Sequence, residues 1–134
     1  MKLRSLEIRN FRRFATASVE FGDGVIGVLG PNGAGKSTLI EAIGWALFGS
    51  EASQVMRNGK ENLRRDGAGP AEALTVELDF EHDGIHYRIR REMRPKGTVD
   101  ARFLAEGKEI GSGTSAVTSA VVKAIGMEDR KSVV

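Results

Sequence analysis

The chain has 134 residues, of which 40% are hydrophobic and 28% are charged, a balance typical of one globular domain. It contains no cysteine, which excludes a disulfide framework, argues against a zinc site and favours a reducing, cytoplasmic setting. No run of about 18 apolar residues is present, so no membrane partner is expected. The formal net charge of +2 permits a nucleic-acid partner but does not require one.

The first stretch of the chain has the pattern of short strands. Apolar and polar residues alternate over 5–9 and again over 18–21, as they do in strands buried on one face. Gly22-Asp23-Gly24 is a turn signal, and the apolar run at 25–29 is typical of a strand buried on both faces. These residues predict a small antiparallel pair that leads into a central strand.

That central strand runs directly into a glycine-rich loop, Gly30-Pro31-Asn32-Gly33-Ala34-Gly35-Lys36-Ser37-Thr38. The loop matches the phosphate-binding pattern G-x-x-x-x-G-K-[ST]. The residues after it are apolar almost all round, which predicts a buried helix over 36–48. Strand, glycine loop and helix together are the context in which this pattern indicates a phosphate site.

The chemistry of the loop follows from its residue types. Gly33 and Gly35 allow backbone angles at which successive N–H groups point toward phosphate oxygens. The start of the helix adds further unpaired N–H groups and the positive end of the helix dipole. Lys36 is placed to neutralise the β- and γ-phosphates, and the Ser37 hydroxyl is placed to bind Mg²⁺.

The Gly49-Ser50 pair marks the end of the helix predicted over 36–48. A second, short helix is expected over 51–57, and residues 58–73 are expected to form a surface loop. Alternation over 74–81 and 85–93 around Asp83-Gly84 predicts a hairpin with a two-residue turn. A third strand is expected at 99–103, with a turn at Glu106-Gly107. Gly111 to Thr114 is expected to be a loop that ends in helix-capping residues. Val117 to Ile125 have helical spacing, and Gly126 is expected to stop that helix.

The hairpin turn fixes the expected register. Its cross-strand pairs are Phe80 with Tyr87, Leu78 with Ile89, Asp79 with Arg88 and Glu77 with Arg90. Asp79 and its neighbouring acids then lie on the outer face of an alternating strand, so we reject them as metal-binding or water-activating groups. His82 and His86 have no partner at ligand spacing and are not expected to bind metal. Of the nearby cations, Arg91, Arg94 and Lys96 remain free to contact DNA phosphates.

Residues 6–14, Leu6-Glu7-Ile8-Arg9-Asn10-Phe11-Arg12-Arg13-Phe14, and the loop-helix residues 30–43 resemble the opening of the SMC-like DNA-repair ATPases. Residues 63–67, 76–80 and 87–91 resemble the SbcC branch in particular. The resemblance covers essentially the whole chain. Its early part is shared with RecF, RecN and SMC proteins, and only the hairpin region favours SbcC.

This resemblance implies an α/β P-loop NTPase fold of the kind found in the N-terminal lobe of an ABC-type ATPase head. A mixed sheet would surround the buried helix, with an antiparallel β-meander at 74–110. Arg12 or Arg13 would lie near the nucleotide. The cofactors would be ATP and Mg²⁺, and the partners would be double-stranded DNA, an SbcD-type nuclease, the C-terminal half of the same head and a second head that closes on ATP. The residues implied to hold ATP phosphates are Asn32, Gly33, Ala34, Gly35, Lys36, Ser37 and Thr38, with Ser37 also at the metal.

Residues 1–134 are expected to form only the N-terminal part of a single head. Nothing in them matches the family's glutamine loop, coiled coil, signature motif or catalytic acids. Phosphoryl transfer needs a group that positions the attacking water, and these residues offer no candidate, so hydrolysis by this chain alone is expected to be very weak or absent. Two alternatives remain: another RecF-, RecN- or SMC-like recombination or chromosome ATPase, and a non-catalytic DNA-binding module that has kept a vestigial loop.

Overall fold

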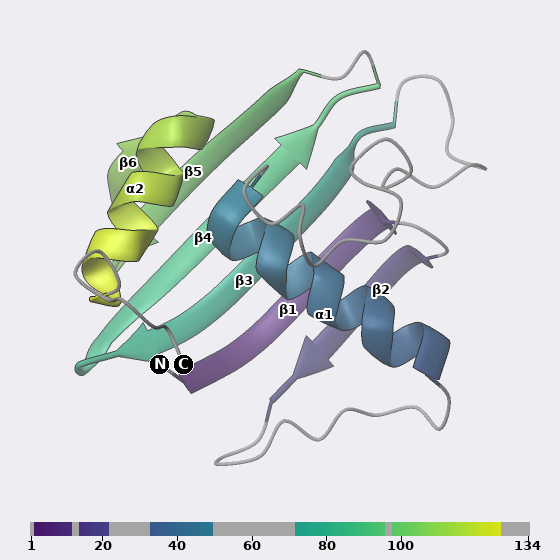
Figure 1. Cartoon of the computed structure of the whole chain (residues 1–134), viewed down its shortest axis with the longest axis horizontal. Coiled ribbons are helices and arrows are strands. Elements are labelled where there is room, and N and C mark those ends of the chain that lie inside the picture. Colours follow the sequence, from purple (N-terminus) through teal and green to yellow (C-terminus); the bar gives the residue numbers. More distant parts are fainter. Residues whose placement is uncertain (1, 12–13, 22–32, 50–71, 96–97, 127–134) are drawn as a thin grey trace.

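The computed structural model describes residues 2–11, 14–21, 33–49, 72–95 and 98–126 (Figure 1). The predicted strand at 25–29, the helix at 51–57 and all but the last two residues of the loop at 58–73 lie outside these ranges. The described elements are the strands β1 (Lys2–Phe11), β2 (Phe14–Glu20), β3 (Leu74–His82), β4 (Ile85–Met93), β5 (Val99–Ala105) and β6 (Lys108–Ser112), and the helices α1 (Gly33–Phe48) and α2 (Thr114–Ala124).

The six strands form one sheet in the order β2-β1-β3-β4-β5-β6, and every neighbouring pair is antiparallel (Figure 1). The predicted α/β architecture and the antiparallel pair at the start of the chain are confirmed. The expected antiparallel meander at 74–110 is confirmed as β3 to β6, and it belongs to the same sheet as the first strands, because β1 pairs directly with β3. Leu6 lies opposite Leu78, and Ile8 lies opposite Val76, so the two segments extend one apolar face.

The predicted hairpin register is confirmed at each of its pairs, Phe80–Tyr87, Leu78–Ile89, Asp79–Arg88 and Glu77–Arg90. Asp83 and Gly84 form the turn with φ angles of 54° and 78°. Two consecutive positive φ values are typical of the turn whose twist matches that of the flanking strands.

Both helices cover the same face of the sheet (Figure 1). Helix α1 contacts β1, β3 and β4, whereas α2 contacts β5, β6 and α1. The core lies between this layer and the sheet. It is formed by apolar side chains from every second strand position and from the inner sides of the helices: Leu6, Ile8, Phe11, Leu39, Ala42, Trp45, Ala46, Leu47, Leu74, Val76, Leu78, Phe80, Tyr87, Ile89, Met93, Ala101, Phe103, Val117 and Val121.

Three details differ from the expectations. Helix α1 begins at Gly33 rather than near Lys36, and it is not buried all round, since Ile40 is 58% exposed. The expected loop before α2 is shorter, because Gly111 and Ser112 belong to β6 and the cap position is Gly113, whose φ is 93°.

Gly126, with a φ of 77°, follows the end of α2 as predicted. None of the helices in the described part of the chain has the length and apolar character needed to cross a bilayer.

Candidate phosphate site and its support

The end of the glycine-rich loop forms the beginning of α1. Gly33, Ala34, Gly35, Lys36, Ser37 and Thr38 are the first residues of the helix. An α-helix leaves its first four N–H groups without partners inside the helix, and its N-terminus favours negative charge. The first turn of α1 contains no acidic residue that would occupy this end in place of a ligand. The backbone of this turn is therefore suited to an anion, and the predicted phosphate site stays a prediction.

The structure places only part of the predicted site. Asn32, Arg12 and Arg13 lie outside the described residues, as do the side chains of Lys36 and Ser37. The Thr38 side chain is 3% exposed, so it faces the interior of the protein. The predicted roles of these residues in holding phosphates and Mg²⁺ stay predictions.

Helix α1 is fixed against the sheet by apolar side chains that follow the loop. Leu39, Ala42, Trp45 and Ala46 belong to the buried core. The Trp45 ring packs against Phe11 at the end of β1, with ring centroids 6.4 Å apart and planes tilted by 52°. Packing along one side of a helix fixes its position on the sheet, so these contacts hold α1 as a whole in place.

At the opposite end of α1, a charged side chain occupies a core position. Arg91 is on β4 between Ile89 and Met93, on the inward face, and is 0% exposed. Its Nε donates to the Ala46 carbonyl at 2.7 Å, and its Nη2 donates to the Leu47 carbonyl at 3.3 Å. The expectation that Arg91 is free to contact DNA is therefore wrong, because its guanidinium is buried against the end of α1.

The signal that could have located Arg91 was present in the sequence. Alternation in β4 places Tyr87, Ile89 and Met93 inward, and Arg91 shares their parity. A charged residue at an inward position of an otherwise apolar strand indicates a buried polar contact rather than a surface patch.

The other predicted DNA contacts have different outcomes. Arg94 forms an ion pair with Asp100 at 2.7 Å, and both side chains are about half exposed. Exposed ion pairs contribute little to stability, so the pair with Asp100 does not prevent Arg94 from contacting a DNA phosphate. Lys96 lies outside the described residues. For both residues the DNA contact stays a prediction.

The outer face of the hairpin contains a well-formed ion pair. Arg88 donates from Nε and Nη2 to the two carboxylate oxygens of Asp79, at 2.8 and 3.1 Å. Hydrogen bonding and charge attraction from Asp79 raise the pKa of Arg88, with a smaller contribution from Glu77, whose Oε2 lies 3.9 Å from the Arg88 Nε. Both oxygens of Asp79 are thus engaged by a cation, and its function in the described structure is to pair the two strands.

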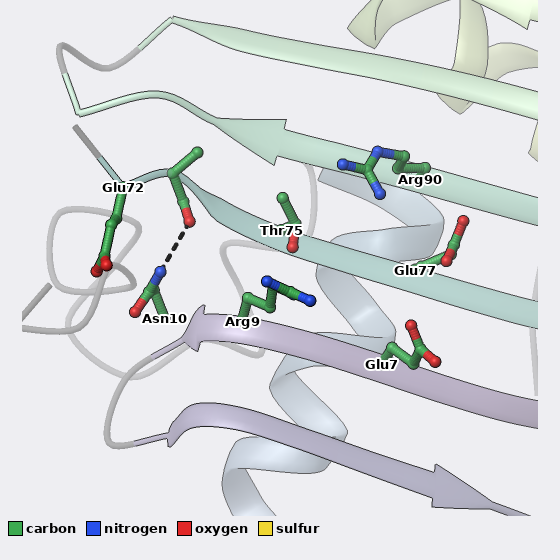
Figure 2. Close-up of a pocket in the computed structure, with 8 residues that line it drawn as sticks. Glu7, Arg9, Asn10, Glu72, Thr75, Glu77 and Arg90 are labelled. Carbon is green, nitrogen blue, oxygen red and sulfur yellow. Dashed lines mark hydrogen bonds between the residues drawn. The ribbon is translucent and has the colours of Figure 1, made fainter. Parts of the chain in front are cut away.

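An open cavity of about 440 Å³ lies on this same outer face, away from α1 (Figure 2). Sequence reasoning did not identify it, because its walls come from β1, β3 and β4, which are brought together only by the β1–β3 pairing. Three carboxylates and two guanidiniums line it, a balance that does not favour a polyphosphate. The lining residues are Glu7, Arg9, Asn10, Glu72, Ala73, Thr75, Glu77 and Arg90.

Comparison with known proteins gives a consistent result. The family described as AAA domain matches residues 5–122. The chain is 31% identical over 132 residues to the DNA double-strand break repair Rad50 ATPase of Methanocaldococcus jannaschii, covering 96% of this chain and 12% of that protein. It is 48% identical over 61 residues to the chromosome partition protein Smc of Lactiplantibacillus plantarum, covering 45% of this chain and 5% of that protein. The chain thus spans about an eighth of the length of the Rad50 relative.

A solved structure extends the likeness to the fold. The SMC head bound to the C-winged helix domain of ScpA superposes with a TM-score of 0.68 and 22% sequence identity, covering 93% of this chain and 41% of that chain. At this identity, the match shows a shared fold and nothing about ligands.

Proposed function

The chain belongs to the AAA domain family and, within it, to the Rad50-like ATPases, and on this premise we propose that it is the ATP- and Mg²⁺-binding N-terminal lobe of a DNA-repair ATPase head. The observation that carries the proposal is the placement of the loop residues 33–38 at the start of α1, in a first turn without acidic side chains. The N–H groups of that turn would hold the phosphates, with Lys36 as the neutralising cation.

The residues present are compatible with magnesium. Mg²⁺ prefers oxygen ligands and usually keeps several waters beside phosphate oxygens, so the Ser37 hydroxyl is a suitable protein ligand. When bound, the ion would supply positive charge that neutralises the phosphates. Lys36 and the backbone of the first turn bind and orient the same phosphates, and the packing of Trp45 on Phe11 helps to fix the helix that presents this turn.

We further propose that ATP turnover requires more than this chain. The residues contain no candidate for positioning the attacking water, and the proposed site would be completed by the C-terminal half of the head and by a second head. The full assembly would couple ATP binding and hydrolysis to the binding of DNA ends and their processing with an SbcD-type nuclease. The Rad50 relative is a DNA double-strand break repair ATPase, which supports this proposal.

Calorimetric titration with Mg-ATP tests the nucleotide site. We expect the wild-type chain to bind Mg-ATP, Lys36→Ala to lose binding, and Lys108→Ala to bind as the wild type does, because Lys108 is an exposed residue of β6. Phosphate release measured on the same samples should be at background. Absence of binding in a folded wild-type chain would contradict the proposal, and turnover abolished by Lys36→Ala would show that a catalytic group is present after all.

A second function is supported by the Smc match over 61 residues, namely an ATPase of chromosome partition or recombination.

A separate test addresses DNA contact by Arg94. If Arg94 meets phosphate, Arg94→Ala should weaken duplex binding and reduce its dependence on salt concentration by about one counterion. Salt-sensitive DNA binding together with no nucleotide affinity would instead support a non-catalytic module with a vestigial loop.

A further inference from the structure

The buried guanidinium of Arg91 joins three elements that are distant in the sequence. Besides the carbonyls of Ala46 and Leu47 at the end of α1, it contacts the first two turns of α2. Its Nη1 donates to the Thr114 hydroxyl at 3.2 Å, and its Nη2 donates to the Thr118 hydroxyl at 3.0 Å. A buried charge is tolerated only where hydrogen bonds replace its water, and here both helices supply the acceptors.

Thr118 extends this contact to a third carbonyl of α1. Its hydroxyl donates to the Phe48 carbonyl at 3.4 Å while accepting from Arg91. The last carbonyls of an α-helix have no partners within the helix, so Arg91 and Thr118 together satisfy groups that would otherwise be buried without hydrogen bonds. Among the described residues, no buried side-chain nitrogen or oxygen is left without a partner.

The charge of Arg91 also suits the end of α1 that it contacts. The C-terminus of a helix is the negative end of its dipole and favours a cation, yet the last turn of α1 contains no basic residue. Arg91 supplies that cation from β4. Gly49, which follows the helix with a φ of 60°, leaves the space for it, since a Cβ at this position would lie 2.9 Å from the Arg91 Nη1.

We infer that Arg91 is a positioning residue for the phosphate site: it ties the C-terminal end of α1 to β4 and α2, and thereby couples nucleotide binding at the other end of α1 to the packing of α2. The inference rests on the proposed function. Helix α1 has 16 residues and is about 24 Å long, a rigid rod whose two ends move together. Since coupling between sites is reciprocal, a nucleotide that fixes the first turn of α1 also steadies α2, and a loose α2 weakens nucleotide binding.

Hydrogen exchange of the 134-residue chain, measured with and without saturating Mg-ATP, tests this coupling. Protection of α2 amides is compared with that of the β3–β4 hairpin, which reports any uniform gain in stability. In the wild type we expect Mg-ATP to slow exchange in α2 beyond its effect on the hairpin. In Arg91→Met and Thr118→Val this extra protection should be lost, and Mg-ATP affinity should fall by about 5- to 30-fold.

Two matched variants complete the design. Thr118→Ser keeps the hydroxyl and should restore both affinity and protection, while Arg88→Met removes an arginine from the outer face of the same strand and should change neither. If Arg91→Met does not fold, Thr118→Val carries the test, because it removes only one hydroxyl from the contact. Wild-type affinity and α2 protection in folded variants would overturn this inference alone. Failure of the wild type itself to bind Mg-ATP would overturn the proposed function, and this inference with it.

Discussion

Replacing Gly49 by alanine tests the packing around Arg91 without removing any polar group. The substitution has two separable costs. A φ of 60° is unfavourable for a residue with a Cβ by about 1–2 kcal/mol. The new methyl would also lie 2.9 Å from Nη1 and 3.2 Å from Cζ of Arg91, so the buried guanidinium must shift. Weakening one hydrogen bond of a buried charged group costs about 1.5–3 kcal/mol.

Gly84→Ala is the matched control for this variant. Gly84 has a φ of 78°, and a Cβ built there meets nothing within 4 Å, so alanine at this position has only the backbone cost. The entropy that alanine removes from the unfolded chain is the same in both variants and cancels. We therefore expect Gly49→Ala to be more destabilising than Gly84→Ala by about 1.5–3 kcal/mol.

Urea unfolding followed by circular dichroism measures the difference. With an m-value of about 2 kcal/mol/M, a gap of about 2 kcal/mol separates the two unfolding midpoints by about 1 M. Equal midpoints for the two variants would refute the reasoning, because they would mean that the guanidinium gives way without loss. In that case the contacts of Arg91 with Ala46 and Leu47 would not be the rigid link that the structure shows.

Four further predictions concern other parts of the sheet. Phe103→Ala should destabilise the fold by about 3–5 kcal/mol in the same unfolding assay, because this buried ring stacks on two others. A double-mutant cycle on Arg88 and Asp79 should give a coupling of about 0.2–1 kcal/mol that shrinks with added salt. Pairing with Asp79 raises the pKa of Arg88, so Arg88 stays charged in both the folded and the unfolded chain from roughly pH 6 to 9. Its titration should therefore not alter the free energy of unfolding in that range, and the stability that it contributes would be lost only as the pH rises through its folded-state pKa. Asn10→Asp should cost about 1–3 kcal/mol by thermal or urea unfolding, because it replaces the amide that donates to the Ala73 carbonyl at 3.0 Å.

Local patterns were sufficient for the hairpin and for α1. Asp83-Gly84 supplies the positive φ angles of a two-residue turn, and once the turn is fixed, the alternation of Leu78, Phe80 and Ile89 determines every pair. The loop pattern likewise predicts the existence of α1 directly after the glycines. These features depend on residues close together in the sequence, where conformational preference and spacing act directly.

The pairing of β1 with β3 could not be predicted in the same way. The two strands are separated by more than sixty residues, as the Asn10–Ala73 hydrogen bond shows, and no turn chemistry links their registers. Their association depends on burying Leu6 and Ile8 beside Leu78 and Val76 under α1, which is a property of the assembled core. The outer cavity, which needs this pairing, was missed for the same reason.

Arg91 combines a local feature with one that depends on the assembled core. The alternation of β4 predicts that its side chain points inward, but its partners on α1 and α2 could not be predicted. Within α1, neither end has the charged side chain that would complement its dipole, an acid in the first turn or a base in the last. Each end is therefore left to a group from elsewhere: Arg91 from β4 at one end and, in the proposed function, the phosphates of a nucleotide at the other. A helix that supplied its own charges would depend less on its neighbours at its two ends. Because α1 does not, its stability depends on the strand that holds Arg91, on α2 and on the ligand together, and this dependence is the physical basis for coupling among them.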